Sequence, residues 1–141
     1  MRAHCGVGTI MKNRALPALH LANAILFWPV LAFVIWGELR PEVPRVLHDI
    51  NDKVLHFSAY FIPAEMAAGA VRQRGWVKWA VLGLITLGAV LEFVQAFVGR
   101  DPSFLDGITN GIGAIAGALL ARFVLDALRV SWQYDTDRPS A

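Results

Sequence analysis

The sequence of 141 residues is 56% hydrophobic and only 17% charged, and its mean hydropathy is +0.49. This composition is too apolar for an ordinary soluble domain, and the length is too short for two domains. The net charge of +2 gives no indication of nucleic-acid binding, and the single cysteine, Cys5, excludes an intrachain disulfide or a cysteine metal cluster. We therefore expect one small membrane domain.

The first apolar run, from about 16 to 37, follows a segment, 1–15, that is basic and contains no acidic residue. This order is also that of a signal sequence. However, the run is longer than a signal-peptide core and lacks a clear small-x-small cleavage site. We predict an uncleaved first transmembrane helix with a bend at Pro29.

The rest of the chain contains three further apolar stretches. Residues 38–51 are polar and include Pro41 and Pro44, which indicates an extramembrane loop with a short surface helix near 43–50. The expected fold class is all-α, a polytopic membrane protein whose domain, residues 16–125, is a bundle of four transmembrane helices. The predicted spans are 16–37, 53–71 with a bend at Pro63, 76–98 and 104–125, followed by a tail over 126–141.

The distribution of Lys and Arg predicts the orientation of the bundle. Nine of the 13 lie in the amino-terminal segment, the turn at 72–78 and the carboxy-terminal region, and four lie in the two loops on the opposite side. Cytoplasmic loops of membrane proteins carry the excess of these residues. Both termini, residues 1–15 and 126–141, are therefore expected in the cytoplasm.

Polar residues gather at the outer ends of the last three predicted spans. At 3.6 residues per turn, Asp52, Lys53, His56 and Tyr60 share one side of the second span. The third span ends, and the fourth begins, with further polar side chains at a similar depth. We therefore predict one site, whose members are Asp52, Lys53, His56, Tyr60, Glu92, Gln95, Arg100, Ser103, Asp106, Asn110 and Gly113.

The fourth predicted span has a face of small residues. Asp106, Asn110, Gly113 and Gly117 follow helical spacing, so a polar end continues into a glycine groove. Small residues let helix backbones approach closely in lipid. This pattern favours packing, including a homo-oligomer through the neighbouring Gly/Ala face, which consists of Gly107, Gly111, Ala114, Ala118 and Ala121.

Three blocks within residues 52–117 have a distinctive order and spacing: Asp52-Lys53-x2-His56-Phe57-x2-Tyr60, Glu92-x2-Gln95, and Arg100-x2-Ser103-x2-Asp106-x3-Asn110-x2-Gly113. Together they resemble the VanZ-like family of small bacterial membrane proteins. The resemblance implies a helical protein of the cell envelope in the bacterial cytoplasmic membrane, and the family's namesake is associated with resistance to the glycopeptide teicoplanin. It implies no biochemical activity. Pro63-Ala64-Glu65 departs from the usual apolar pattern, so any role of Glu65 would be particular to this protein.

Most of the polar residues also have a purely structural explanation. His56 suits proton transfer or phosphate recognition, but it could equally be a hydrogen-bonded packing residue, with Asp52, Glu92 or Tyr60 as its partner. Lys53 opposes the helix macrodipole unless an anion lies nearby, and Asp52 could be that anion. Glu92 is costly in an apolar helix unless it is paired, for example with Lys53, His56 or Arg100.

The start of the fourth span has a similar alternative. Ser103 and Asp106 fit a capping box that would satisfy free amides of the helix, although this leaves Asn110 unexplained. Arg100 follows a helix end, where a cation is favourable in any case, but it could also grip a phosphate or carboxylate.

Three functions follow from these alternatives. The site could bind an anionic membrane lipid or a lipid-linked cell-wall precursor, with Lys53 and Arg100 neutralising phosphate. It could instead be a membrane-surface transferase or hydrolase that uses His56 with Glu92 or Asp106. The third alternative is a structural membrane subunit in which the polar residues pair with one another. A single histidine in the cluster argues against a zinc site, and we expect neither a metal nor a cofactor.

Overall fold

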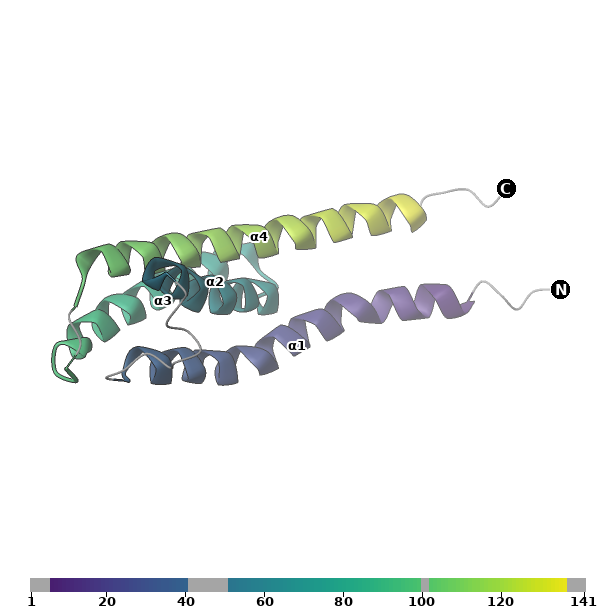
Figure 1. The fold of residues 1–141 in the computed structure, drawn as a ribbon. Coiled ribbons are helices and arrows are strands. Elements are labelled where there is room, and N and C mark those ends of the chain that lie inside the picture. Colours follow the sequence, from purple (N-terminus) through teal and green to yellow (C-terminus); the bar gives the residue numbers. More distant parts are fainter. Residues whose placement is uncertain (1–5, 41–50, 100–101, 137–141) are drawn as a thin grey trace.

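The computed structural model describes residues 6–40, 51–99 and 102–136, and these form four helices (Figure 1). The helices are α1 (Gly6–Glu38), α2 (Asp52–Ala70), α3 (Arg74–Gln95) and α4 (Phe104–Thr136). Among these described residues, three segments are long and apolar enough to cross a membrane, and these are Leu16–Glu38, Arg74–Gln95 and Phe104–Arg129. The predicted all-α membrane protein is confirmed to this extent.

Both outer helices are longer than the spans predicted for them. α1 begins at Gly6 rather than near 16, and it continues through Pro17 and Pro29. α4 continues through the segment expected to be a polar tail, as far as Thr136, because no glycine or proline occurs between Gly117 and Pro139. The expected surface helix at 43–50 lies outside the described residues.

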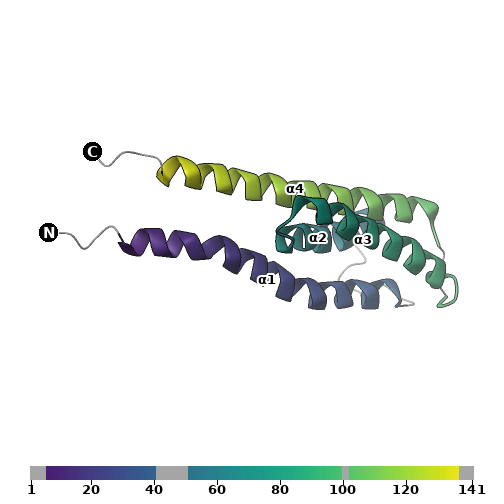
Figure 2. The same cartoon turned by 180° about the vertical axis from the view of Figure 1, so that it is seen from behind.

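The helices run in alternating directions. In Figures 1 and 2 the long α1 and α4 extend toward the same end of the molecule, where both chain termini lie. At the opposite end, the Gln95 side-chain amide donates to the Glu38 backbone carbonyl (3.1 Å) and to the Glu38 carboxylate (2.6 Å). The last turns of α1 and α3 therefore lie together, beside the first turns of α2 and α4, which an ion pair between Lys53 and Asp106 connects.

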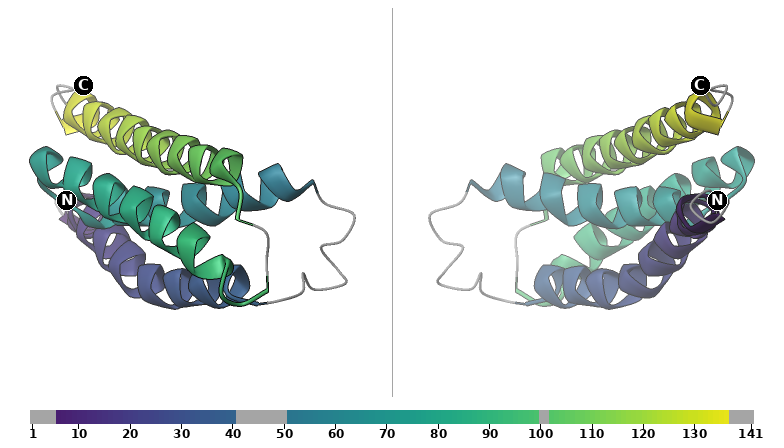
Figure 3. Two further views of the ribbon diagram at one scale, coloured as in Figure 1. Left: turned by 90° about the vertical axis from the view of Figure 1, so that its left-hand side faces the viewer. Right: turned by 90° about the vertical axis from the view of Figure 1, so that its right-hand side faces the viewer.

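α2 is the central helix, although its first turns carry several polar side chains. It contacts all three other helices, and Figure 3 shows it between α4 on one side and α1 on the other. Its buried residues beyond the first turns are mostly small, and they include Ala64, Ala67 and Ala68. The three apolar helices thus enclose a helix that carries several polar side chains.

The contact between α2 and α4 depends on two glycines. A Cβ atom added at Gly113 would collide with the Phe57 carbonyl oxygen, and one added at Gly117 would collide with the Phe61 carbonyl oxygen. The two backbones therefore touch, as the glycine groove in the sequence predicts. We call this contact the α2–α4 seam. It also buries three residues of the Gly/Ala face, Ala114, Ala118 and Ala121.

The carboxyl end of α2 is held by side chains from its neighbours. His20 of α1 hydrogen-bonds to the Gly69 carbonyl oxygen. Arg122 of α4 donates to the carbonyl oxygens of Ala68 (3.3 Å) and Val71 (3.0 Å). These bonds satisfy carbonyls that have no partner within the helix, so both ends of α2 are fixed in the bundle.

Candidate functional site

His56 lies at the centre of the polar residues at the other end of α2. The helix begins at Asp52 because the Asn51 side chain accepts a hydrogen bond from the Lys53 backbone N–H (2.9 Å) and so caps it. One turn later the His56 side chain points into the bundle, and the residue is only 4% exposed. Its imidazole therefore depends on neighbouring side chains for polar contacts.

Each nitrogen of the His56 ring faces two carboxylates. Nδ1 is 3.4 Å from Glu38 Oε1 and 3.9 Å from Glu92 Oε1. Nε2 is 3.7 Å from Asp52 Oδ1 and 3.7 Å from Asp106 Oδ2. The structure thus brings together four acidic side chains from four helices, three of which the sequence predicts as members of one site. We call these four residues and His56 the carboxylate–histidine cluster.

Lys53 compensates the carboxylates on the Nε2 side of the ring. Its ammonium group forms an ion pair with Asp106 and lies 3.7 Å from Asp52 Oδ2. The sequence suggests Asp52 as its structural partner, and the structure adds the buried Asp106 from α4. Lys53 remains 44% exposed, so this side of the cluster reaches the surface.

The Glu92 carboxylate is oriented by the turn that precedes α4. The Ser103 backbone N–H donates to Glu92 Oε2 (3.0 Å). The Ser103 carbonyl accepts from the backbone N–H groups of Asp106 (2.9 Å) and Gly107 (3.3 Å). Because the Asp106 side chain is directed to Lys53, it joins the cluster instead of serving only as a helix cap.

Glu38 of the carboxylate–histidine cluster belongs to the segment 38–51, which the sequence predicts to be an extramembrane loop. In the structure it is the last residue of α1 and is 6% exposed, and Gln95 binds its carboxylate. A helical stripe in the sequence predicts this position, because Phe27, Leu31 and Val34 precede it at the same spacing and pack in the core. The two prolines that follow obscure this signal.

Asn110 joins the cluster to the backbone of α2 and α4. Its amide oxygen and nitrogen are best assigned with the nitrogen toward α2, where it donates to the carbonyl oxygens of His56 (3.2 Å) and Asp106 (3.3 Å). In this orientation the same nitrogen lies 3.2 Å from His56 Nδ1. Asn110 therefore has two backbone acceptors whether or not Nδ1 accepts its hydrogen bond.

The remaining predicted residues lie at different distances from the cluster. Tyr60 is fully buried one turn below His56, and its hydroxyl has no hydrogen-bond partner among the described residues. Gly113 contacts the α2 backbone and belongs to the seam. Glu65 is partly buried farther along α2, as its separate position in the sequence predicts. Arg100 lies outside the described residues.

The cluster carries more negative than positive charge. The Lys53 ammonium group contacts Asp52 and Asp106, on the Nε2 side of the ring. Arg40, another cation described at this end, lies over the Trp36 ring, 4.5 Å from its centroid. Like charges repel strongly where little water screens them. The carboxylates of Glu38 and Glu92 therefore repel each other where both approach the His56 ring.

Comparisons of the chain with protein-family models, with curated proteins and with solved structures found no match. The resemblance to the VanZ-like family therefore stays a prediction from the three sequence blocks. What the cluster can do is argued from its own geometry.

Proposed function

We propose that the chain crosses the membrane four times, with both termini in the cytoplasm. α1 and α3 are apolar and run in the same direction, so the chain between them has to return across the bundle. α2 is the segment that does so. Its 19 residues extend about 28 Å, close to the thickness of the hydrocarbon core. The excess of Lys and Arg on the side of the termini supports this orientation.

At the outer end, we propose, the carboxylate–histidine cluster binds the polar head of a membrane lipid or a lipid-linked cell-wall precursor. One observation carries the proposal, which is that large apolar side chains project outward on the same helical turns that carry the cluster. Val54, Phe93 and Phe104 are all exposed beside Lys53, Glu92 and Asp106. Hydrocarbon chains would cover these side chains, so the head of such a lipid would lie at the level of the cluster.

A phosphate in that head group would need more positive charge than Lys53 supplies. The Lys53 ammonium is already shared by Asp52 and Asp106. Arg100 follows α3 in the sequence and is the second cation in this proposal. Gln95, Asn110 and Tyr60 would orient the head group, and the resemblance to the VanZ-like family suggests a ligand of the bacterial cell envelope, related to glycopeptide resistance.

Lipid analysis of the purified protein tests this proposal. Replacing Lys53 and Arg100 together by alanine is expected to reduce co-purifying anionic lipid about tenfold, because each lost charge-assisted contact is worth on the order of 1 kcal/mol or more. The matched control replaces Lys78 and Arg129, two cations near the opposite end. An unchanged lipid content in the Lys53/Arg100 variant would contradict anionic-lipid binding.

The same preparations distinguish the alternative functions. Turnover of the lipid that is lost in His56→Ala, with binding retained, would identify a transferase or hydrolase that uses His56 with Glu92 or Asp106. Absence of both binding and turnover would identify a structural subunit whose polar residues serve only to join the helices.

We propose that any homo-oligomer uses a narrower face of α4 than the sequence suggests. Ala114, Ala118 and Ala121 are buried within the chain, mostly against α2. Gly107 and Gly111 remain available, since a Cβ atom at either position would have no neighbour within 4 Å. A second copy would therefore approach α4 near the outer end, and cysteine crosslinking at position 111 would detect it.

A further inference from the structure

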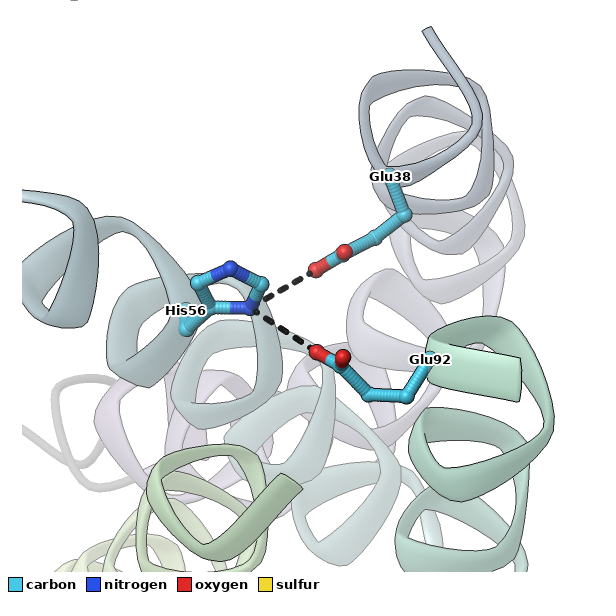
Figure 4. A group of neighbouring side chains, drawn as sticks. All are labelled: Glu38, His56 and Glu92. Carbon is cyan, nitrogen blue, oxygen red and sulfur yellow. Dashed lines mark ion pairs between the residues drawn. The ribbon is translucent and has the colours of Figure 1, made fainter. Parts of the chain in front are cut away.

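The Nδ1 side of His56 has a geometry unlike that of a hydrogen-bonded pair. Figure 4 shows the carboxylates of Glu38 and Glu92 converging on this nitrogen. The distances of 3.4 and 3.9 Å exceed the usual range of about 2.7–3.2 Å for a hydrogen bond. Two ligands that share one tetrahedral ion at about 2.0–2.2 Å from it lie about 3.3–3.6 Å apart. The 3.4 Å distance to Glu38 lies within this range, and the 3.9 Å distance to Glu92 lies just above it.

Each of the two carboxylates is oriented by a hydrogen bond to its Oε2 atom. Gln95 binds Oε2 of Glu38, and the Ser103 backbone N–H binds Oε2 of Glu92. In each case the other oxygen, Oε1, is the one directed at His56. Outer partners that fix a ligand's orientation in this way are a regular feature of protein metal sites.

The Oε1 atom of Glu92 lacks a partner of its own. Glu92 is 8% exposed, and this oxygen is buried and accepts no hydrogen bond within the described parts of the chain. A buried carboxylate oxygen without a donor is unfavourable, because it has given up water and received nothing in return. Its direction toward His56 Nδ1 indicates where a cation would sit.

The ring itself supports the same position. Nε2 faces the carboxylates of Asp52 and Asp106, whereas the Asn110 amide nitrogen lies 3.2 Å from Nδ1, so the proton of the neutral ring belongs on Nε2. The Nδ1 lone pair then faces the carboxylate oxygens of Glu38 and Glu92. A bound cation would turn the repulsion among these electron-rich atoms into coordination.

Asp52, His56 and Asp106 form a second group of potential ligands, but Lys53 already contacts both aspartates. All three ligand atoms of the first group lie within 4.8 Å of one another. We propose that Glu38, His56 and Glu92 bind a divalent metal ion through Oε1, Nδ1 and Oε1. The sequence, with one histidine, argues against a zinc site, but the structure adds Glu38, and one imidazole with two carboxylates suits Mn²⁺ or Zn²⁺.

Three protein ligands leave at least one coordination position open. A phosphate oxygen of the lipid head group would fill it, and the ion would supply the positive charge that anion binding at this acidic end requires. This second step rests on the proposed function, whereas binding of the ion does not.

Metal binding by the full-length protein in detergent tests the inference. After removal of metal by a chelator, the protein is dialysed against Zn²⁺ or Mn²⁺ alone, and the bound metal is counted by mass spectrometry. One ion per chain is expected. Glu38→Gln and Glu92→Gln are expected to weaken binding about 100-fold or more, and Gln95→Met about tenfold through loss of orientation. Glu65→Gln, on the same bundle but outside the cluster, is the control and should bind normally.

A stability measurement separates loss of the site from loss of the fold. Without metal, Glu92→Gln should unfold at the same temperature as the unmodified chain or higher, because it removes one of the repelling charges. Added metal should stabilise the unmodified chain and not Glu92→Gln. Absence of bound metal in the unmodified chain, or equal binding by Glu92→Gln, would overturn the inference.

Lipid binding is then measured with and without the ion. Phosphatidylglycerol binding in nanodiscs that falls at least tenfold when the chelator is present would support the bridging role. Metal binding without any lipid binding would refute the proposed function and leave the metal site standing. Lipid binding that is unaffected by the chelator would refute the bridging role alone.

Discussion

The α2–α4 seam and the carboxylate–histidine cluster adjoin each other on the same two helices, yet they are completed in different ways. In the seam, the two surfaces fit each other, since Gly113 and Gly117 of α4 make room for the α2 backbone at Phe57 and Phe61. In the cluster, Glu38 and Glu92 face one imidazole, and Glu92 Oε1 lacks a donor among the described residues. The seam needs nothing further to be stable. The proposed metal ion would complete the cluster.

Adding a methyl group inside the seam should have the largest effect. Gly117→Ala forces the α4 backbone away from Phe61, and we expect a loss of about 2–3 kcal/mol in the free energy of unfolding. Gly111→Ala is the matched control, since no atom lies within 4 Å of the added Cβ. It should be neutral or stabilising by up to about 1 kcal/mol, because alanine favours helix. Denaturant unfolding in mixed micelles measures both, and equal effects of the two substitutions would refute the seam.

Removing the cation on the compensated side of the cluster should have an intermediate effect. Lys53→Met leaves the buried Asp106 without its ion pair. We expect a loss of about 1–2 kcal/mol, smaller than for a fully buried pair because Lys53 is partly exposed. The double variant Lys53→Met/Asp106→Asn should recover most of this loss. No recovery in the same unfolding assay would show that the two side chains are not energetically coupled.

The smallest effect is expected at the far end of α2. Arg122→Met removes the donor to the Ala68 and Val71 carbonyls and should cost about 1 kcal/mol. Hydrogen exchange should increase at the last turn of α2 and not at its first turn. Arg129→Met is the control, because its contact with Asp126 is 4.0 Å long and partly exposed, and it should change stability by less than about 0.5 kcal/mol. Exchange that rises equally at both ends would contradict local capping by Arg122.

The sequence predicts the helices and much of the cluster, for reasons that are local. Hydropathy identifies the apolar helices, and helical spacing places Asp52, Lys53 and His56 on one face. The direction of successive helices then brings Glu92 and Asp106 to the same end. The position of Glu38 is harder to predict from the sequence, because Pro41 and Pro44 suggest a loop. In the structure α1 ends at Glu38, which is buried against Gln95. α4 is longer than predicted because no glycine or proline interrupts it after Gly117, and α1 is longer because its helix begins on the amino-terminal side of Pro17.

Close contact between the backbones of α2 and α4 also has a mechanical consequence. The two helices are joined along Gly113 and Gly117, so they would tilt together as one rigid body that carries His56.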